Sequence, residues 1–148
     1  MGEIRVLLAD DHAPFREGLR AILDGQSDMT VVGEAKDGVE ATEKASELAP
    51  DIILMDINMP LRNGLEATCL IAAQNPQMPV IILTMFVEDE HVLEAVKAGA
   101  RGYILKSTSG QELVEAIRTV HQGGSVLDPG AMKTVLQEFR RLADDSKE

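Results

Sequence analysis

The chain has 148 residues, of which 45% are hydrophobic and 3% aromatic, and it carries a formal net charge of −11 at pH 7. This length and composition suit one domain with an aliphatic core, and the acidic balance argues against direct binding to nucleic-acid phosphates. No run approaches the roughly 20 apolar residues of a membrane span, and the single cysteine, Cys69, excludes an internal disulfide and indicates a cytoplasmic protein.

Short apolar runs alternate with amphipathic segments along the chain. The predicted strands are residues 4–9, 30–34, 52–56, 80–84 and 102–105. Each is followed by a predicted helix, and these helices end near Gly25, Pro50, Asn75, Gly99 and Gly123. Five strand-helix units predict an α/β protein with a parallel sheet, right-handed crossovers and helices on both faces.

A sixth helical segment, 128–143, follows the five units. Asp128 can cap it, and Pro129 suits its first turn. One stripe of this helix carries Met132, Val135, Leu136, Phe139 and Leu142. We therefore expect a domain at 3–122, followed by a linker and an additional C-terminal helix at 123–148. The stripe could pack on its own domain, on a second chain or on another domain, and we expect it to be covered.

The stretch at 52–64, IILMDINMPLRNG, indicates a central strand that ends on an aspartate. Its first four residues are apolar without alternation, which is typical of a strand covered on both faces. We therefore expect Asp56 at the carboxyl end of a central strand, where the strand reaches the rim of the sheet. Pro60 and Gly64 then predict a tight loop and the start of a helix.

Polar side chains lie at the ends of four predicted strands. They are Asp10 and Asp11 after the first strand, Asp56 on the third, Thr84 on the fourth and Lys106 after the fifth. Because the carboxyl ends of parallel strands share one edge, we expect these side chains to converge.

Three neighbouring carboxylates repel one another unless a cation is present. Oxygen ligands favour Mg²⁺, whereas zinc lacks its usual ligands because Cys69 lies inside a helix and His12 is alone. An aspartate can act as a nucleophile toward phosphorus, and Asp56 is the candidate.

Each of these residues also has a purely structural interpretation. An acid pair before a helix usually caps it, and an aspartate after a strand usually starts a turn. Thr84 could be an ordinary strand residue and Lys106 a solvated strand end. The coincidence at four strand ends favours a functional site. The histidines His12, His91 and His121 are interpreted as solvated surface residues.

The acid pair, the aspartate of DINMPLRNG, the threonine of VIILT and the lysine of YILK resemble the motifs of a known family in order and spacing. That family is the receiver domain of two-component response regulators, and the resemblance covers about residues 3–122. It implies a flavodoxin-like, doubly wound five-stranded sheet of order 2-1-3-4-5 with five flanking helices.

The resemblance also implies the chemistry of the site. Asp56 would accept a phosphoryl group from a histidine kinase, and Lys106 would contact that group. Thr84 would move toward the phosphoryl group, and Tyr103 would change rotamer. Mg²⁺ would be held by Asp10, Asp11, Asp56 and the backbone carbonyl of Asn58. The protein would not be an enzyme, beyond catalysing its own aspartyl phosphorylation and dephosphorylation.

The stretch KSTSGQELVEAI followed by GGSVLDPGAM resembles the LuxR-type branch of response regulators. There a linker helix joins the receiver to a helix-turn-helix DNA-binding domain. Nothing after Asp128 supplies a basic recognition face, so DNA contact is expected only through a domain missing from this chain. Homodimers that form on phosphorylation, often through the first and fifth helices, are a further expectation. A stand-alone receiver that acts in a phosphorelay or by protein contact is the alternative.

Two other functions fit the sequence less well. A haloacid-dehalogenase-type phosphatase needs an acid two residues after its nucleophile, and position 58 is Asn. A flavodoxin-like flavin carrier needs a Ser, Thr or Gly-rich loop after the first strand, where this chain has DDHAP.

Overall fold

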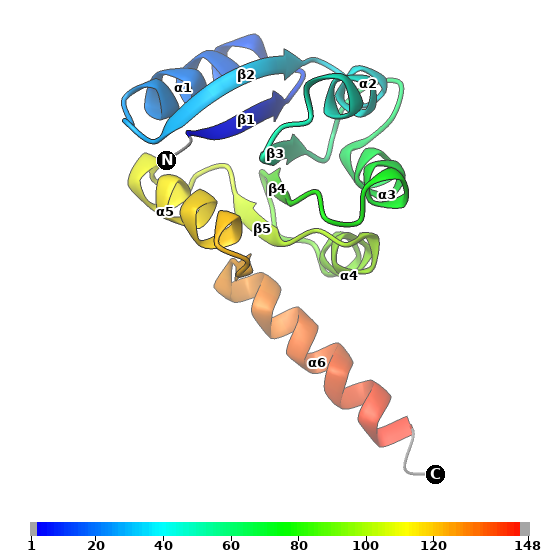
Figure 1. The fold of residues 1–148 in the computed structure, drawn as a ribbon. Coiled ribbons are helices and arrows are strands. Elements are labelled where there is room, and N and C mark those ends of the chain that lie inside the picture. The colour runs from blue at the N-terminus through cyan, green and yellow to red at the C-terminus, as the bar shows by residue number, and fades with distance from the viewer. Residues whose placement is uncertain (1–2, 146–148) are drawn as a thin grey trace.

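A computed structural model describes residues 3–145 and contains a parallel sheet with helices on both faces (Figure 1). The strands are β1 (Ile4–Ala9), β2 (Met29–Ala35), β3 (Ile52–Asp56), β4 (Val80–Thr84), β5 (Gly102–Leu105) and β6 (Val126–Leu127). The helices are α1 (Ala13–Asp24), α2 (Gly38–Leu48), α3 (Gly64–Gln74), α4 (Asp89–Ala98), α5 (Gly110–His121) and α6 (Pro129–Asp145).

The sheet has the order β2-β1-β3-β4-β5-β6, and all of its neighbouring strands are parallel. The predicted order 2-1-3-4-5 is therefore confirmed. The structure adds β6, which pairs with Gly102 and Tyr103 of β5. The prediction of five strands missed it because two residues are too short to carry a periodic pattern.

The sheet separates two hydrophobic cores. Helices α1 and α5 cover one face, and α2, α3 and α4 cover the other (Figure 1). Side chains alternate between the cores along β1: Val6 and Leu8 point to the α1 and α5 side, and Leu7 and Ala9 to the opposite side. Every residue of β3 is buried, as its continuous apolar run predicted.

Local capping signals fix where several helices begin and end. The side chain of Asp37 accepts a hydrogen bond from Glu40 N at 2.7 Å, and Ser109 caps α5 in the same way. Asn63 and Glu66 form a reciprocal capping box at the start of α3. Gly99 ends α4 in the left-handed conformation with φ of 97°, which glycine adopts without steric strain.

Helix α6 extends away from the rest of the domain (Figure 1). Its first turns pack on the domain through buried Ala131 and Thr134 and partly buried Val135. The remaining residues of the predicted apolar stripe, Met132, Leu136, Phe139 and Leu142, are 43–70% exposed. Within residues 3–145 of one chain these side chains are not covered, and a cover from a second chain or another domain stays a prediction. Neither α6 nor any other helix within residues 3–145 is long and apolar enough to cross a bilayer.

Candidate functional site

The structure brings together charged side chains from three strand ends. Asp56 is the last residue of β3, Asp10 follows β1, and Lys106 follows β5. The Lys106 Nζ atom lies 2.6 Å from Asp10 Oδ2 and 3.3 Å from Asp56 Oδ1. The Lys106 side chain is only 8% exposed, and its ammonium lies 4.6 Å from the centre of the Phe15 ring. A buried cation thus bridges two buried carboxylates.

Several hydrogen bonds fix Asp10 at the start of the β1–α1 loop. Its backbone N–H donates to Ala35 O at 3.0 Å, and its Oδ1 accepts the His12 N–H at 2.7 Å. The side chain is 2% exposed. Asp10 Oδ2 lies within ion-pair distance of Lys106 but accepts no hydrogen bond of suitable geometry from any described residue. That oxygen therefore retains lone pairs that a cation could bind.

The chain packs tightly behind Asp56. A Cβ atom built on Gly64 would lie 2.0 Å from the Asp56 carbonyl oxygen, so only glycine fits at the start of α3. The Gly64 N–H also donates to Ile57 O at 2.8 Å. These contacts close the loop between β3 and α3 and hold the Asp56 backbone in place.

The environment of Asp56 disfavours its charge. Burial raises the pKa of its carboxyl group, the negative charge of Asp10 raises it further, and Lys106 opposes both, so that the pKa is about 6. The side chain is 5% exposed. Near neutral pH the ionised form predominates at an energetic cost, which a bound cation would relieve.

This raised pKa predicts how stability depends on pH in metal-free protein. Between the ordinary aspartate pKa of 3.8 and the folded-state value of about 6, the folded state keeps a proton that the unfolded state loses. Rising pH therefore favours unfolding in that window, and the effect levels off above it. Relative to Asp56→Asn, the wild-type free energy of unfolding should fall by about 1 kcal/mol from about pH 5 to about pH 7. Denaturant titrations of both proteins in EDTA would measure this. A wild-type free energy of unfolding that rises, relative to that of Asp56→Asn, over the same pH range would contradict the prediction.

The carboxylates lie close enough to share one cation. Ligand atoms of Asp10, Asp11, His12 and Asp56 all lie within 4.8 Å of one another. Carboxylate oxygens at this spacing fit an oxygen-preferring divalent cation that keeps some of its waters. Asn58 is exposed in the loop that follows Asp56. The residues thus form an acidic cluster that could bind a metal.

His12 belongs to this cluster, which the sequence interpretation did not foresee. It is exposed, as expected, with 70% of its side chain accessible, yet its Nδ1 atom lies 3.1 Å from Asp11 Oδ1. The only sequence signal was its position directly after the acid pair. His91 lies on α4, with Nδ1 3.3 Å from Glu88 Oε2, and His121 is exposed at the end of α5.

Thr84 and Tyr103 lie on the neighbouring strands β4 and β5. Thr84 is buried, and its hydroxyl donates to the Phe86 carbonyl at 3.0 Å. Tyr103 is fully buried, and within residues 3–145 its hydroxyl makes no hydrogen bond of full geometry, although the Thr84 side chain and the Glu88 backbone lie nearby. Burial raises the pKa of Tyr103, and the nearby Thr84 side chain partly offsets this. The Thr84 hydroxyl is therefore engaged with the β4–α4 loop.

Comparison with known proteins identifies the family. The family model of the response regulator receiver domain matches residues 6–118. The chain belongs to this family. A receiver domain is a signalling module and not a conventional enzyme. The acidic pocket formed by Asp10, Asp11 and Asp56 with Lys106 is consistent with the phosphoacceptor site of a receiver domain.

Several relatives of this chain are longer regulatory proteins. Transcriptional regulatory protein LnrK of Bacillus subtilis (strain 168) is 44% identical over 138 residues, which are 93% of this chain and 63% of LnrK. Response regulator protein VraR of Staphylococcus aureus (strain NCTC 8325 / PS 47) is 43% identical over 141 residues, which are 95% of this chain and 68% of VraR. The chain thus spans about two thirds of the length of these relatives.

Solved structures agree with this assignment. A LuxR-family two-component response regulator from Aurantimonas sp. SI85-9A1 superposes with a TM-score of 0.86 at 35% identity, and the match covers 93% of this chain and 98% of that chain. The response regulator domain of Thermotoga maritima CheB gives a TM-score of 0.76 at 44% identity, and the match covers 81% of this chain and 97% of that chain.

Proposed function

We propose that this receiver domain accepts a phosphoryl group on Asp56 from a histidine kinase, in a reaction that requires Mg²⁺. The observation that carries the proposal is the meeting of Asp10, Asp56 and Lys106, with one ammonium 2.6 Å and 3.3 Å from the two carboxylates. A structural ion pair would need one acid, whereas the second acid and the exposed Asp11 beside it favour a site for a cation and a phosphoryl group.

The transfer uses the Asp56 carboxylate as nucleophile. One of its oxygens forms a bond to phosphorus while the bond from phosphorus to the imidazole nitrogen of the kinase phosphohistidine breaks. The imidazole leaves with the electron pair of that bond and takes up a proton. A pKa of about 6 leaves most of Asp56 ionised near neutral pH, which this attack requires.

The other charged groups have complementary roles. The carboxylates of Asp10, Asp11 and Asp56 and the backbone carbonyl of Asn58 would hold Mg²⁺, which when bound neutralises negative charge on the carboxylates and the phosphoryl oxygens. The Lys106 ammonium would then contact the phosphoryl group.

Thr84 and Tyr103 are the proposed switch. Thr84 would have to release the Phe86 carbonyl before its hydroxyl could bind the phosphoryl group. The Tyr103 side chain, whose buried hydroxyl has no hydrogen-bond partner of full geometry within residues 3–145, would change rotamer as Thr84 moves. Phosphorylation at Asp56 would in this way reach the β4–α4 loop.

The proposed output is control of transcription through a DNA-binding domain outside this chain. Its support is that LnrK, at 44% identity, is a transcriptional regulatory protein. A homodimer formed on phosphorylation is part of the same proposal. The alternative is a receiver that acts in a phosphorelay or by protein contact, and phosphorylation-dependent promoter binding by the whole protein would argue against that alternative.

The intact mass of the protein tests the proposed chemistry. After incubation with a small acyl phosphate and Mg²⁺, the protein should gain the mass of one phosphoryl group, because the acyl phosphate can replace the kinase as donor. EDTA should prevent the gain, since the acidic cluster then lacks its cation. An equal gain with and without EDTA would contradict the role of the metal, and no gain in either condition would contradict the phosphoacceptor function.

A further inference from the structure

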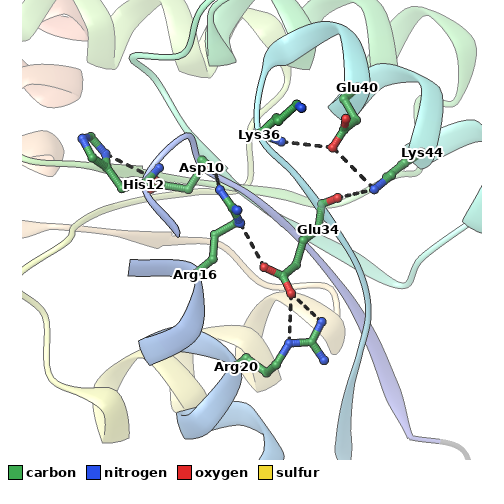
Figure 2. Close-up of polar contacts among 8 residues, drawn as sticks. All are labelled: Asp10, His12, Arg16, Arg20, Glu34, Lys36, Glu40 and Lys44. Carbon is green, nitrogen blue, oxygen red and sulfur yellow. Dashed lines mark hydrogen bonds and ion pairs between the residues drawn. The ribbon is translucent and has the colours of Figure 1, made fainter. Parts of the chain in front are cut away.

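One guanidinium group connects the acidic site to the edge strand β2. Arg16 Nη1 donates to the carbonyl oxygen of Asp10 at 2.5 Å, and Arg16 Nε donates to Glu34 Oε1 at 2.9 Å (Figure 2). The Arg16 side chain is 17% exposed. Arg16 lies in the first turn of α1. Its two hydrogen bonds therefore link the β1–α1 loop to strand β2.

Glu34 is itself firmly held. Arg20, one turn after Arg16 on α1, donates to Glu34 Oε2 from Nε at 3.0 Å and from Nη2 at 2.6 Å. These two arginines hold the pKa of Glu34 below its ordinary value, with Arg20 the larger cause, despite the opposing effect of burial. Lys44 on α2 donates to the Glu34 carbonyl and lies 3.4 Å from Glu40 Oε1 (Figure 2). Glu34 therefore gives Arg16 a fixed anchor.

The Arg16 contact differs in kind from the other contacts to Asp10. His12 and Lys106 engage the two carboxylate oxygens, which are also the atoms a cation would bind. Arg16 engages the backbone carbonyl, so its hydrogen bond needs no carboxylate oxygen and can persist when a cation is bound. The Asp10 carbonyl belongs to the peptide group between Asp10 and Asp11, so this hydrogen bond restrains the backbone that carries both acid side chains.

We propose that Arg16, anchored by Glu34, is a positioning residue that holds the Asp10 and Asp11 carboxylates in the geometry for cation binding. This inference rests on the proposed function, because it assigns a role toward the cation of that site. Arg16 itself would not touch the cation.

The sign of the change in Mg²⁺ affinity distinguishes this role from a simple charge effect. Arg16→Met removes a positive charge near an acidic site, which by Coulomb attraction alone would tighten Mg²⁺ binding. If Arg16 positions the loop, the same variant should instead weaken Mg²⁺ binding by about tenfold, the effect typical of losing a group that orients a metal ligand. Isothermal titration with MgCl₂ measures the dissociation constant directly.

Arg20→Met is the matched control. It removes the same charge from the same face of α1 and breaks an ion pair with the same Glu34, but Arg20 makes no contact with Asp10 in the described structure. Its Mg²⁺ affinity should fall less than that of Arg16→Met, because Arg16 still donates to Glu34 Oε1 and to the Asp10 carbonyl when Arg20 is replaced. Thermal unfolding of both variants without metal shows whether each remains folded.

Arg16→Lys gives a second readout and decides the question if Arg16→Met does not fold. It keeps the charge but cannot span Asp10 and Glu34 with a planar fork, so Mg²⁺ binding should still weaken. Wild-type affinity in both Arg16 variants, or tighter binding in Arg16→Met, would overturn the positioning role alone. A wild-type protein that binds no Mg²⁺ would instead overturn the metal dependence of the proposed function and this inference with it.

Discussion

Asp56→Asn should leave the protein folded and abolish the mass gain from an acyl phosphate in Mg²⁺. The amide nitrogen and oxygen that replace the carboxylate are poor nucleophiles, whereas the other contacts of the site remain. The variant should also be more stable than wild type near neutral pH without metal, because it removes a buried carboxylate whose pKa is raised to about 6. Loss of phosphorylation together with gained stability separates a chemical role from damage to the fold.

Asp51→Asn is the control for this prediction. Asp51 directly precedes β3, at the end of the strand opposite Asp56, and its Oδ2 accepts the Arg5 N–H at 2.9 Å. Its phosphoryl gain should equal that of wild type. An Asp56→Asn protein that is phosphorylated as fast as wild type would show that another residue is the acceptor.

Lys106→Met should slow phosphorylation of Asp56 by about 100-fold at saturating Mg²⁺. The ammonium lies between two buried carboxylates, where it can stabilise the charge of the incoming phosphoryl group in a largely desolvated site. Mg²⁺ affinity should stay unchanged or increase, because a positive charge that competes for Asp10 is lost. Slower transfer with undiminished Mg²⁺ binding is therefore the expected combination.

The rate is measured from intact mass against time, and Mg²⁺ binding by titration. Lys133→Met, on the exposed side of α6, removes the same charge away from the site and should behave as wild type. A Lys106→Met protein that is phosphorylated at the wild-type rate would reduce Lys106 to a structural ion pair.

Much of the fold was predictable because local signals and topology agree. The uninterrupted apolar runs of β3 and β4 marked buried parallel strands, and the stops at Gly25 and Gly99 set helix ends. The strand β6 escaped prediction because its pairing with β5 depends on where the chain returns after α5. Two residues carry no periodicity of their own.

The sequence left open what the apolar stripe of α6 packs against. Within a single chain the helix docks through Ala131 and Thr134, with partly buried Val135 of the predicted stripe beside them. Leu136 and Phe139 of the stripe are exposed there. Small side chains allow close approach, and the Thr134 hydroxyl donates to Asp89 Oδ1 at 2.7 Å on α4. Apolar content alone does not specify which face finds a partner of matching shape.

The convergence of the site was predictable, and the support around it was not. Parallel strands place Asp10, Asp56 and Lys106 at the same end of the sheet, and this follows from the direction of the backbone alone. Arg16 was missed because its partner Glu34 lies on β2, and only the tertiary structure places the two together. A spacing of four residues places Arg16 and Arg20 on one face of a helix, but it does not show what that face contacts.

The central claim is that Asp56 carries the phosphoryl group, and the most direct measurement is to locate that group in the chain. Wild-type protein treated with an acyl phosphate and Mg²⁺ is digested under conditions that preserve acyl phosphates, and the peptides are sequenced by mass spectrometry. We predict that the added mass lies on Asp56, in the peptide that contains β3. The same mass on Asp10 or Asp11, or on no aspartate at all, would contradict the assignment.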